Sequence, residues 1–368
     1  MANKATIERN QKIDDYLSSL YKLAKDGNYT TNQDSYFALL NNIFNSSTIS
    51  YREIVLVALV GRMLDDNYRA CSKFYSCKPR GIYDNGPIKV FLLENGFPHS
   101  KSGPLNIAKA SNIDEAWSRQ RDDREGAENV VELIRMIDDG SEEIRKDIGV
   151  DLMRMYISIA EHVKNLIVNI QPSSDPAFLS HLCSEMIKSA PDSGNTPQRI
   201  FGYLLESHHQ SIGSTIIVSG TEDSASATST TSKKPGDINE EGKDGTIYNV
   251  YEVTVKKFDR SRILDSYDCV KKYNDEHKTE IKEIIVVCRK QDCIPEMKKS
   301  GLNFCMGSFE YKDVIYHYWN IYEWITYTLE HMIPSARNTF YHKLNDYINN
   351  PNTHKKVKVL WKQLNSSK

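Results

Sequence analysis

Apolar residues recur at intervals of three and four positions through the first half of the chain. This spacing puts apolar side chains on one face of a helix, so residues 1–190 are predicted to be mostly helical. The clearest segments are Tyr36–Phe44, Ile54–Leu64, Val130–Ile137 and Met153–Ile170. Among them, the stretch Lys78–Asn106 is punctuated by Gly and Pro, which favours ordered loops or a short hairpin.

Strand patterns begin after residue 190. Thr196 and Pro197 are typical of a helix start, and the β-branched run Ser214–Ser219 fits a short strand. The Ser/Thr-rich segment Gly220–Lys234 is predicted to be a mobile surface loop. Pro235–Phe258 then has the pattern of a strand, a glycine-containing turn and a long strand.

A helix and a buried strand are predicted to follow this hairpin. The apolar positions at helical spacing are Ile263, Leu264, Tyr267 and Val270. Ile284–Cys288 is a continuous apolar run flanked by charge, as in a central strand. The order helix, strand, hairpin, helix, strand predicts an α/β (α+β) fold with a central mixed sheet flanked by helices.

From about Lys312 the chain is rich in aromatic residues, and we expect helices whose aromatic side chains lie in a core. Three parts result: a helical domain at 1–190, an α/β core at 191–310, and a C-terminal helical extension at 311–368. The basic tail His354–Lys362 is interpreted as a charged helix end.

Composition adds few constraints. The chain has 368 residues, 39% hydrophobic and 26% charged, which suits two globular domains and excludes wholesale disorder. The polar N-terminal segment and the shortness of the longest apolar run, Ile54–Val60, predict a cytoplasmic protein without a membrane span. A net charge of -2 excludes a uniformly basic nucleic-acid binder, but not a protein with a local basic groove.

The seven cysteines are interpreted as reduced structural thiols. Neither the Cys71/Cys77 pair nor the Cys288/Cys293 pair has the CxxC spacing of a zinc site. Adjacent imidazoles at His208 and His209 would point to different faces of a helix, so capping or surface roles are expected for them. The sequence contains no glycine-rich phosphate loop and no nucleophile elbow.

Two carboxylates in the predicted hairpin form the main candidate site. Asp237 and Glu252 would lie on adjacent antiparallel strands joined by a turn at Glu240–Gly245. Alternation along the second strand would put Glu252, Thr254 and Lys256 on one face. Such a polar row belongs either to an exposed surface hairpin or to a functional site.

Carboxylate oxygens, supplemented by a main-chain carbonyl such as that of Val253, are suitable ligands for Mg²⁺. Such an ion activates water and neutralises phosphate charge during phosphodiester hydrolysis. Lys256 is the candidate for a nearby cation, and Thr254 for a hydrogen bond to the water or the phosphate.

The segments QRIFGYLLESHH and PGDI…YEVTVKKF, with the helix and strand after them, resemble the PD-(D/E)xK nuclease core. PGD and EVTVK look like the SacI-type type II restriction endonucleases, and a weaker similarity extends through YRACSKFY and GPLNIAKA. The resemblance implies Asp237 and Glu252 as metal ligands. It also implies Glu206 as an additional metal-binding acid, with a solvated position on the helix as the alternative for this residue. It further places Thr254 where the family has its catalytic lysine. Three alternatives follow: Lys256 supplies the positive charge instead, the metal ion does more of the catalytic work, or the protein is an inactive relative.

A type II restriction endonuclease would cut double-stranded DNA at a short palindromic site, as a homodimer, with a cognate DNA methyltransferase as its genetic partner. Two alternatives remain open: a repair or structure-specific nuclease, and a noncatalytic DNA-binding protein. We expect the helical domain to serve DNA recognition or dimerisation. Its candidate phosphate- and base-contacting residues are Arg69, Lys73, Arg80, Lys101 and Lys109.

Overall fold

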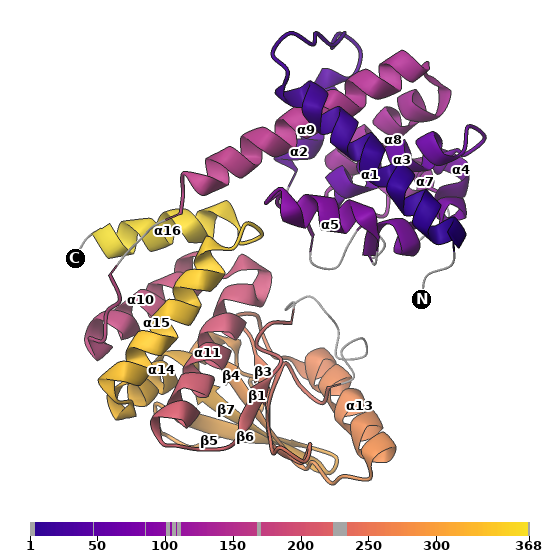
Figure 1. The fold of residues 1–368 in the computed structure, drawn as a ribbon. Coiled ribbons are helices and arrows are strands. Elements are labelled where there is room, and N and C mark those ends of the chain that lie inside the picture. Colours follow the sequence, from indigo (N-terminus) through magenta and orange to yellow (C-terminus); the bar gives the residue numbers. More distant parts are fainter. Residues whose placement is uncertain are drawn as a thin grey trace. The chain divides into compact units, whose positions relative to one another are not determined.

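The computed structural model describes residues 4–46, 48–84, 86–100, 104, 108, 112–167, 171–223 and 234–366. The chain forms two compact units, residues 1–165 and 166–368 (Figure 1). The boundary lies earlier than the expected residue 190, because the helix at 176–189 contributes Leu179, Leu182 and Met186 to a core of the second unit. None of the described helices is long and apolar enough to cross a membrane.

The first unit is helical, as its apolar periodicity predicts. Helix α3 is buried on all sides from Ser50 to Arg62, and the other helices pack around it. In the described residues, the α-helices are α1 (Lys4–Lys25), α2 (Phe37–Asn45), α3 (Ser50–Leu64), α4 (Ala70–Lys73), α5 (Pro87–Glu94), α7 (Glu115–Ser118), α8 (Arg124–Asp139) and α9 (Glu142–Lys164). Residues 168–170, the end of one predicted helical segment, lie outside the described residues.

In the Gly- and Pro-rich stretch after Lys78, residues 80–84 and 87–94 are helical, so the prediction of loops or a hairpin was wrong there, whereas residues 95–100 form a turn and a loop as predicted. A π-helical turn spans Arg80–Asp84, and α5 begins at Pro87. The extended Gly86 precedes this proline, which occupies the first helical turn, where its missing N–H costs nothing. The two residue types therefore mark a helix start here.

The described part of the second unit holds a seven-stranded mixed sheet with the order β1-β2-β3-β4-β7-β6-β5. Strands β1, β2 and β3 form an antiparallel meander, β3 and β4 are parallel, and so are β4 and β7. The strands are β1 (Ile217–Ser219), β2 (Ile238–Glu241), β3 (Ile247–Val253), β4 (Glu283–Cys288), β5 (Lys298–Lys299), β6 (Cys305–Tyr311) and β7 (Val314–Asn320).

Helices cover both faces of the sheet (Figure 1). The helical layer on one face consists of α10 (Pro176–Ser189), α11 (Asn195–Ser211), α14 (Ile321–His331), α15 (Pro334–Asn349) and α16 (Lys355–Ser366). Of these, α11 and α14 contact the strands, and α15 and α16 pack on α11 and α10. The other face packs against α13 (Arg260–His277), which supplies Ile263, Tyr267 and Val270 to a separate core. The predicted α/β fold with a mixed, helix-flanked sheet is thereby confirmed.

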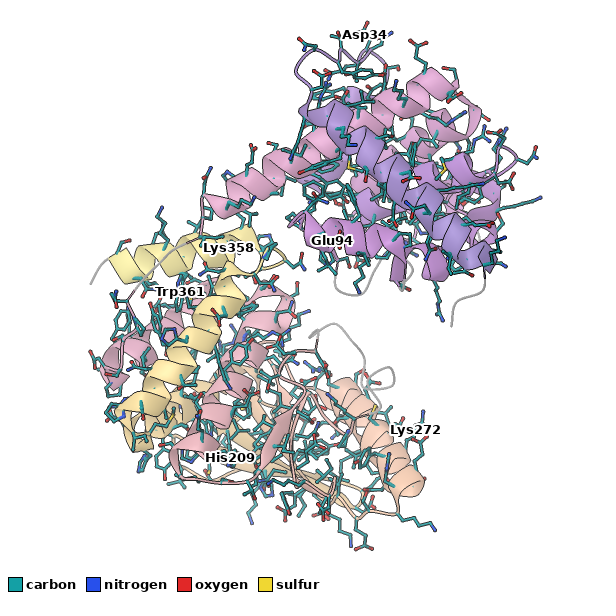
Figure 2. All side chains as sticks on the ribbon, viewed as in Figure 1. Asp34, Glu94, His209, Lys272, Lys358 and Trp361 are labelled. Carbon is teal, nitrogen blue, oxygen red and sulfur yellow. The ribbon has the colours of Figure 1, made fainter. Side chains whose placement is uncertain are left out.

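Two element predictions in this unit were wrong. Residues 314–320 form β7 instead of a helix, and their side chains alternate in burial, with Tyr316 and Tyr318 fully buried. Strand β3 ends at Val253, short of the predicted Phe258. The Thr254 hydroxyl accepts the Lys256 N–H at 3.0 Å and donates to the Lys256 carbonyl at 3.1 Å, so the chain turns out of the sheet. Most aromatic residues of α14 to α16 lie in the core, among them Trp361 (Figure 2), whereas Tyr327 of α14 is 53% exposed.

Candidate functional site

The antiparallel register of β2 and β3 brings Asp237 and Glu252 together. Ile238 pairs with Tyr251, and both side chains lie in the core on the α11 side. Asp237, one residue before β2, is therefore opposite Glu252, and both carboxylates lie on the α13 side of the sheet, because side chains alternate along a strand. The predicted convergence of these two acids is present.

Glu252 is a buried carboxylate held by α13. Its Oε1 accepts a hydrogen bond from the Ser266 hydroxyl at 3.1 Å, and its Oε2 lies 3.7 Å from the Arg262 guanidinium. Burial and the neighbouring Asp237 charge raise the pKa of Glu252 to about 8, although Arg262 and Ser266 oppose this shift. Without a cation, Glu252 therefore keeps a proton at neutral pH.

Asp237 borders a cavity of about 300 Å³. Its Oδ2 accepts the Val253 N–H at 3.0 Å. Burial raises the pKa of Asp237, and this hydrogen bond and the Arg262 charge partly offset the rise. The cavity is lined by Asp237, Lys256, Arg262, the segment Val253–Val255, and Ser193 and Gly194 at the start of α11.

Thr254 and Lys256 occupy different positions from those that strand alternation predicts. The Thr254 side chain is buried, and its hydroxyl is fully used within the protein, since it also accepts a 2.7 Å hydrogen bond from Arg262. Lys256 lies beyond the end of β3, where its exposed side chain borders the cavity. The two residues do not form a polar row on the strand with Glu252.

Arg262 is a cation of the site that the sequence analysis missed. Its guanidinium contacts Thr254 and Glu252 and stacks over the Phe258 ring at 5.1 Å. It lies in the first turn of α13, where the Asp259 side chain accepts the N–H groups of Ser261 and Arg262. The sequence signal for this cation was the Asp-x-x-Arg pattern after the strand. A capping aspartate fixes where the helix begins, and this places the arginine three residues later in the first helical turn.

The donor set fits a hard divalent cation. Asp237 and Glu252 are two close carboxylates, and the charge of Asp237 raises the pKa of Glu252. A bound cation would offset the repulsion between the two negative charges. Among the described residues, no group of three or more His, Cys, Asp or Glu side chains could hold a metal ion. The candidate site thus has two acidic ligands, with main-chain carbonyls and water left to complete the coordination.

No protein-family model and no curated protein sequence matches this chain. The chemistry that the site can perform therefore follows from its geometry and from the residues that compose it.

The structure does not bring Glu206 to this site. Glu206 is twelve residues beyond Gly194, or about 18 Å along α11 at the usual helical rise, and it forms a 2.6 Å ion pair with Lys343 of α15. The acid expected as an additional metal ligand instead joins two helices. The sequence pattern around this glutamate is the same whether its carboxylate binds a metal ion or pairs with a lysine, so spacing alone could not distinguish the two roles.

His209 does not fit the expected capping or surface role either, whereas His208 is partly exposed. His209 of α11 (Figure 2) is buried. Its Nε2 contacts Glu240 of β2. Glu240 also accepts hydrogen bonds from Asn249 and from the Tyr251 hydroxyl. This polar cluster joins α11 to the hairpin on the opposite side of the sheet from Glu252, because Glu240 and Tyr251 face the helical layer.

The candidate DNA-contacting residues lie in the first unit. Arg69 donates to the carbonyls of Asp66 and Tyr68, both at 2.9 Å, so part of its hydrogen-bonding capacity is used locally. Lys73 and Arg80 are exposed. Lys101 and Lys109 lie outside the described residues. A role in DNA binding stays a prediction for all of these residues.

Proposed function

We propose that this protein is a Mg²⁺-dependent endonuclease of the restriction type that cuts double-stranded DNA. The observation that carries the proposal is the convergence of Asp237 and Glu252 beside Arg262 at one cavity. The order α11, β1, β2, β3, α13, β4 adds support, because it matches the helix, strand, hairpin, helix, strand order on which the resemblance to PD-(D/E)xK nucleases is based.

Asp237 and Glu252 would hold the cation through their carboxylate oxygens. When bound, Mg²⁺ lowers the pKa of a water molecule and neutralises charge on the phosphate. Arg262 keeps Glu252 in place and brings positive charge to the cavity wall, the task that the family assigns to a lysine. The exposed Lys256 is free to approach a phosphate at the rim.

The first turn of α11 favours an anion at the same place. Ser193 and Gly194 border the cavity immediately before this helix, and the N-terminal end of a helix carries partial positive charge. A DNA phosphate in the cavity would then meet the helix end on one side and Arg262 and Lys256 on the other. The products would be a 5′-phosphate and a 3′-hydroxyl.

Purified protein incubated with plasmid DNA, with and without Mg²⁺, tests the proposal. Discrete fragments that form only with Mg²⁺ are the expected result. Structure-dependent nicks would indicate a repair nuclease instead, and intact DNA under all conditions would contradict both. The homodimer and the methyltransferase partner are further parts of the proposal, the first argued from the symmetry of a palindromic target.

Substitution of either acid provides a sharper test. We predict that Asp237→Ala and Glu252→Ala abolish cleavage, while binding to the same DNA survives in Ca²⁺. Asp244→Asn, which removes an exposed charge in the turn of the same hairpin, is the matched control and should cut normally. Full cleavage by either alanine variant would refute the metal site.

A noncatalytic DNA-binding protein is the second candidate. The observation that favours it is the closed network of Thr254, Arg262, Glu252 and Ser266, in which each side chain already has a partner inside the protein. Retention of DNA on a gel without cleavage in Mg²⁺ or Mn²⁺ would support this alternative over the nuclease.

A further inference from the structure

Three sulfur atoms lie together at the end of β4. Cys288 is the last residue of this strand and is fully buried, and Cys293 follows the 3-10 turn Lys290–Asp292. The Cys293 Sγ lies 3.8 Å from the Cys288 Sγ and 3.8 Å from the Met306 Sδ. Both cysteines are free thiols. The fold has thus brought two thiols into contact across a short turn.

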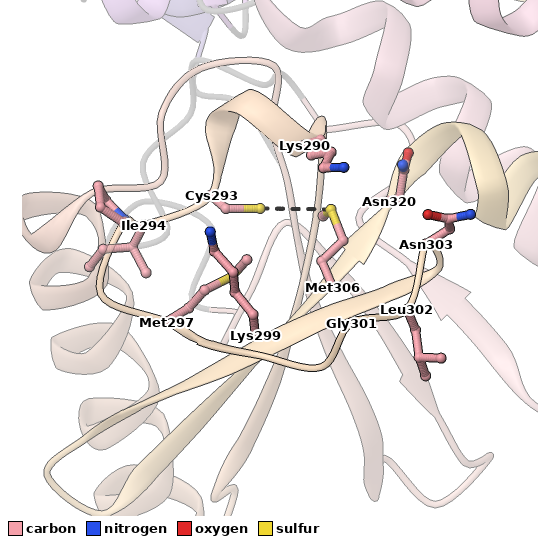
Figure 3. A pocket seen from close by; sticks show the side chains of 11 residues that line it. Lys290, Cys293, Ile294, Met297, Lys299, Gly301, Leu302, Asn303, Met306 and Asn320 are labelled. Atoms are coloured by element: carbon pink, nitrogen blue, oxygen red, sulfur yellow. Dashed lines mark hydrogen bonds between the residues drawn. The ribbon is translucent and has the colours of Figure 1, made fainter.

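Only one of these thiols is accessible to a reagent. Cys293 is partly exposed and lines a cavity of about 480 Å³, whose wall also carries Lys290 and Lys299 and no carboxylate (Figure 3). The hydrogen bond with Cys288 lowers the pKa of the Cys293 thiol, against the opposing effects of burial and the Asp292 charge, whereas that bond and burial raise the pKa of Cys288. An accessible thiol in a positively charged pocket is the kind that reacts.

The turn between the two cysteines supports the candidate active site. Arg289 forms an ion pair with Asp292 at 2.6 Å and donates to the Val255 carbonyl. The Asp292 carbonyl accepts the Phe258 N–H at 2.8 Å. These contacts hold the segment Thr254–Phe258, which includes Lys256 and leads into the helix of Arg262.

We propose that Cys288 and Cys293 are a modification site, which a small anionic disulfide such as glutathione disulfide converts into a reversible intramolecular disulfide. The Cys293 thiolate attacks one sulfur of the reagent, and the broken disulfide releases one thiolate, which takes up a proton. The Cys288 thiol then loses its proton, attacks the Cys293 sulfur and expels the second thiol. Two protein thiols are oxidised, and one reagent disulfide is reduced to two thiols.

Oxidation changes the turn that supports the site. The sulfur atoms must approach from 3.8 Å to the bonded separation of about 2.05 Å, which draws Cys293 and the neighbouring Asp292 toward β4. The hydrogen bond from Phe258 and the contact from Arg289 to Val255 then loosen. The effect on DNA cleavage rests on the proposed function, whereas disulfide formation does not.

Mass spectrometry after reaction with glutathione disulfide and alkylation tests the modification. The wild-type protein is expected to lose two hydrogens and to yield one Cys288–Cys293 cross-linked peptide, which dithiothreitol reverses. Cys288→Ser should stop at a stable glutathione adduct on Cys293, and Cys293→Ser should not react at the buried Cys288. Cys305→Ser, which removes a nearby thiol on β6, is the control and should behave as the wild type.

A persistent adduct on wild-type Cys293 without the cross-link would overturn the proposal, as would equal reactivity in the Cys293→Ser variant. Hydrogen exchange gives a second readout, and the amides of residues 254–258 should exchange about tenfold faster after oxidation. Unchanged exchange would refute the coupling to the site. If the cross-link forms and exchange rises but neither state cuts DNA, the proposed function fails and this inference stands.

Discussion

Arg262 supplies the positive charge that the sequence lacks at Thr254. A guanidinium presents several fixed donors, so one side chain can bind the Thr254 hydroxyl and approach the Glu252 carboxylate together. The same cation lowers the pKa of both acids, against the effect of burial. Under the proposed function, Arg262 on the following helix would supply the positive charge that the family pattern assigns to a lysine on the strand, since both positions border the same cavity.

Replacement of this cation should affect catalysis more than folding. We predict that Arg262→Met slows Mg²⁺-dependent cleavage by roughly 100-fold or more, the usual cost of losing a charge-stabilising group. Arg260→Met on the same helix, where the arginine is exposed and pairs with Glu296, is the matched control and should cut normally. If Lys256→Ala instead shows the large loss and Arg262→Met does not, Lys256 is the catalytic cation.

The raised pKa of Glu252 makes stability depend on pH. The folded protein holds this proton up to a pH of about 8, whereas the unfolded chain releases it near 4.5. The unfolded state therefore binds fewer protons between these values, and stability falls as pH rises through them. Glu252→Gln should therefore reduce this fall, and the raised pKa of Asp237 accounts for the part that remains.

Urea unfolding at pH 5 and pH 8.5 in EDTA measures this difference. Glu283→Gln, at an exposed position on β4, controls for the loss of one negative charge. Addition of Mg²⁺ at pH 8.5 should stabilise the wild type and leave Glu252→Gln unchanged, because only the native carboxylate pair binds the ion. A wild-type stability that rises from pH 5 to 8.5, with no advantage of the variant, would contradict the assignment.

The elements that form the site are a hairpin and the first turn of a helix. The hairpin closes through the Gly242 N–H to the Thr246 carbonyl at 2.8 Å, with Gly245 at a φ of +84° that favours glycine. The helix begins at the Asp259 cap. Both features are local, and each positions one half of the cavity wall.

Loss of the α13 cap should therefore have two effects. Asp259→Ala should lower the free energy of unfolding by about 1 kcal/mol, as is typical of a lost N-cap, and should also slow cleavage because Arg262 loses its anchor. Asp175→Ala removes the equivalent cap of α10, where Asp175 accepts the Ala177 N–H at 3.0 Å. We expect the same loss of stability in this control, with normal cleavage. Equal cleavage by both variants would refute the anchoring role.

At the scale of the whole molecule, the two units have separate cores. The buried apolar residues of the first unit form one cluster, and those of the second form two clusters on opposite faces of the sheet. A unit with its own core is able to fold alone. The candidate site lies entirely within residues 193–266 of the second unit.

We accordingly predict that a chain beginning at Leu166 folds without the first unit. Circular dichroism should show a single cooperative thermal transition with mixed helix and strand content. The fragment should also retain the Mg²⁺-dependent stabilisation expected of the full chain. A fragment that melts without cooperativity would show that the second unit requires the first.

The pattern of apolar and turn residues alone predicted the helical first half, the hairpin with its two acids, helix α13 and strand β4, because these features depend on local spacing. Burial by distant elements decided the rest. The aromatic segment at 314–320 became a strand because β4 was available to pair with it, and Glu206 became the partner of Lys343 because α15 packs on α11. Only tertiary structure brought Arg262 to Glu252 and Cys293 to Cys288. Whether two side chains interact depends on the distance between their atoms in the fold, and their separation along the chain does not determine that distance.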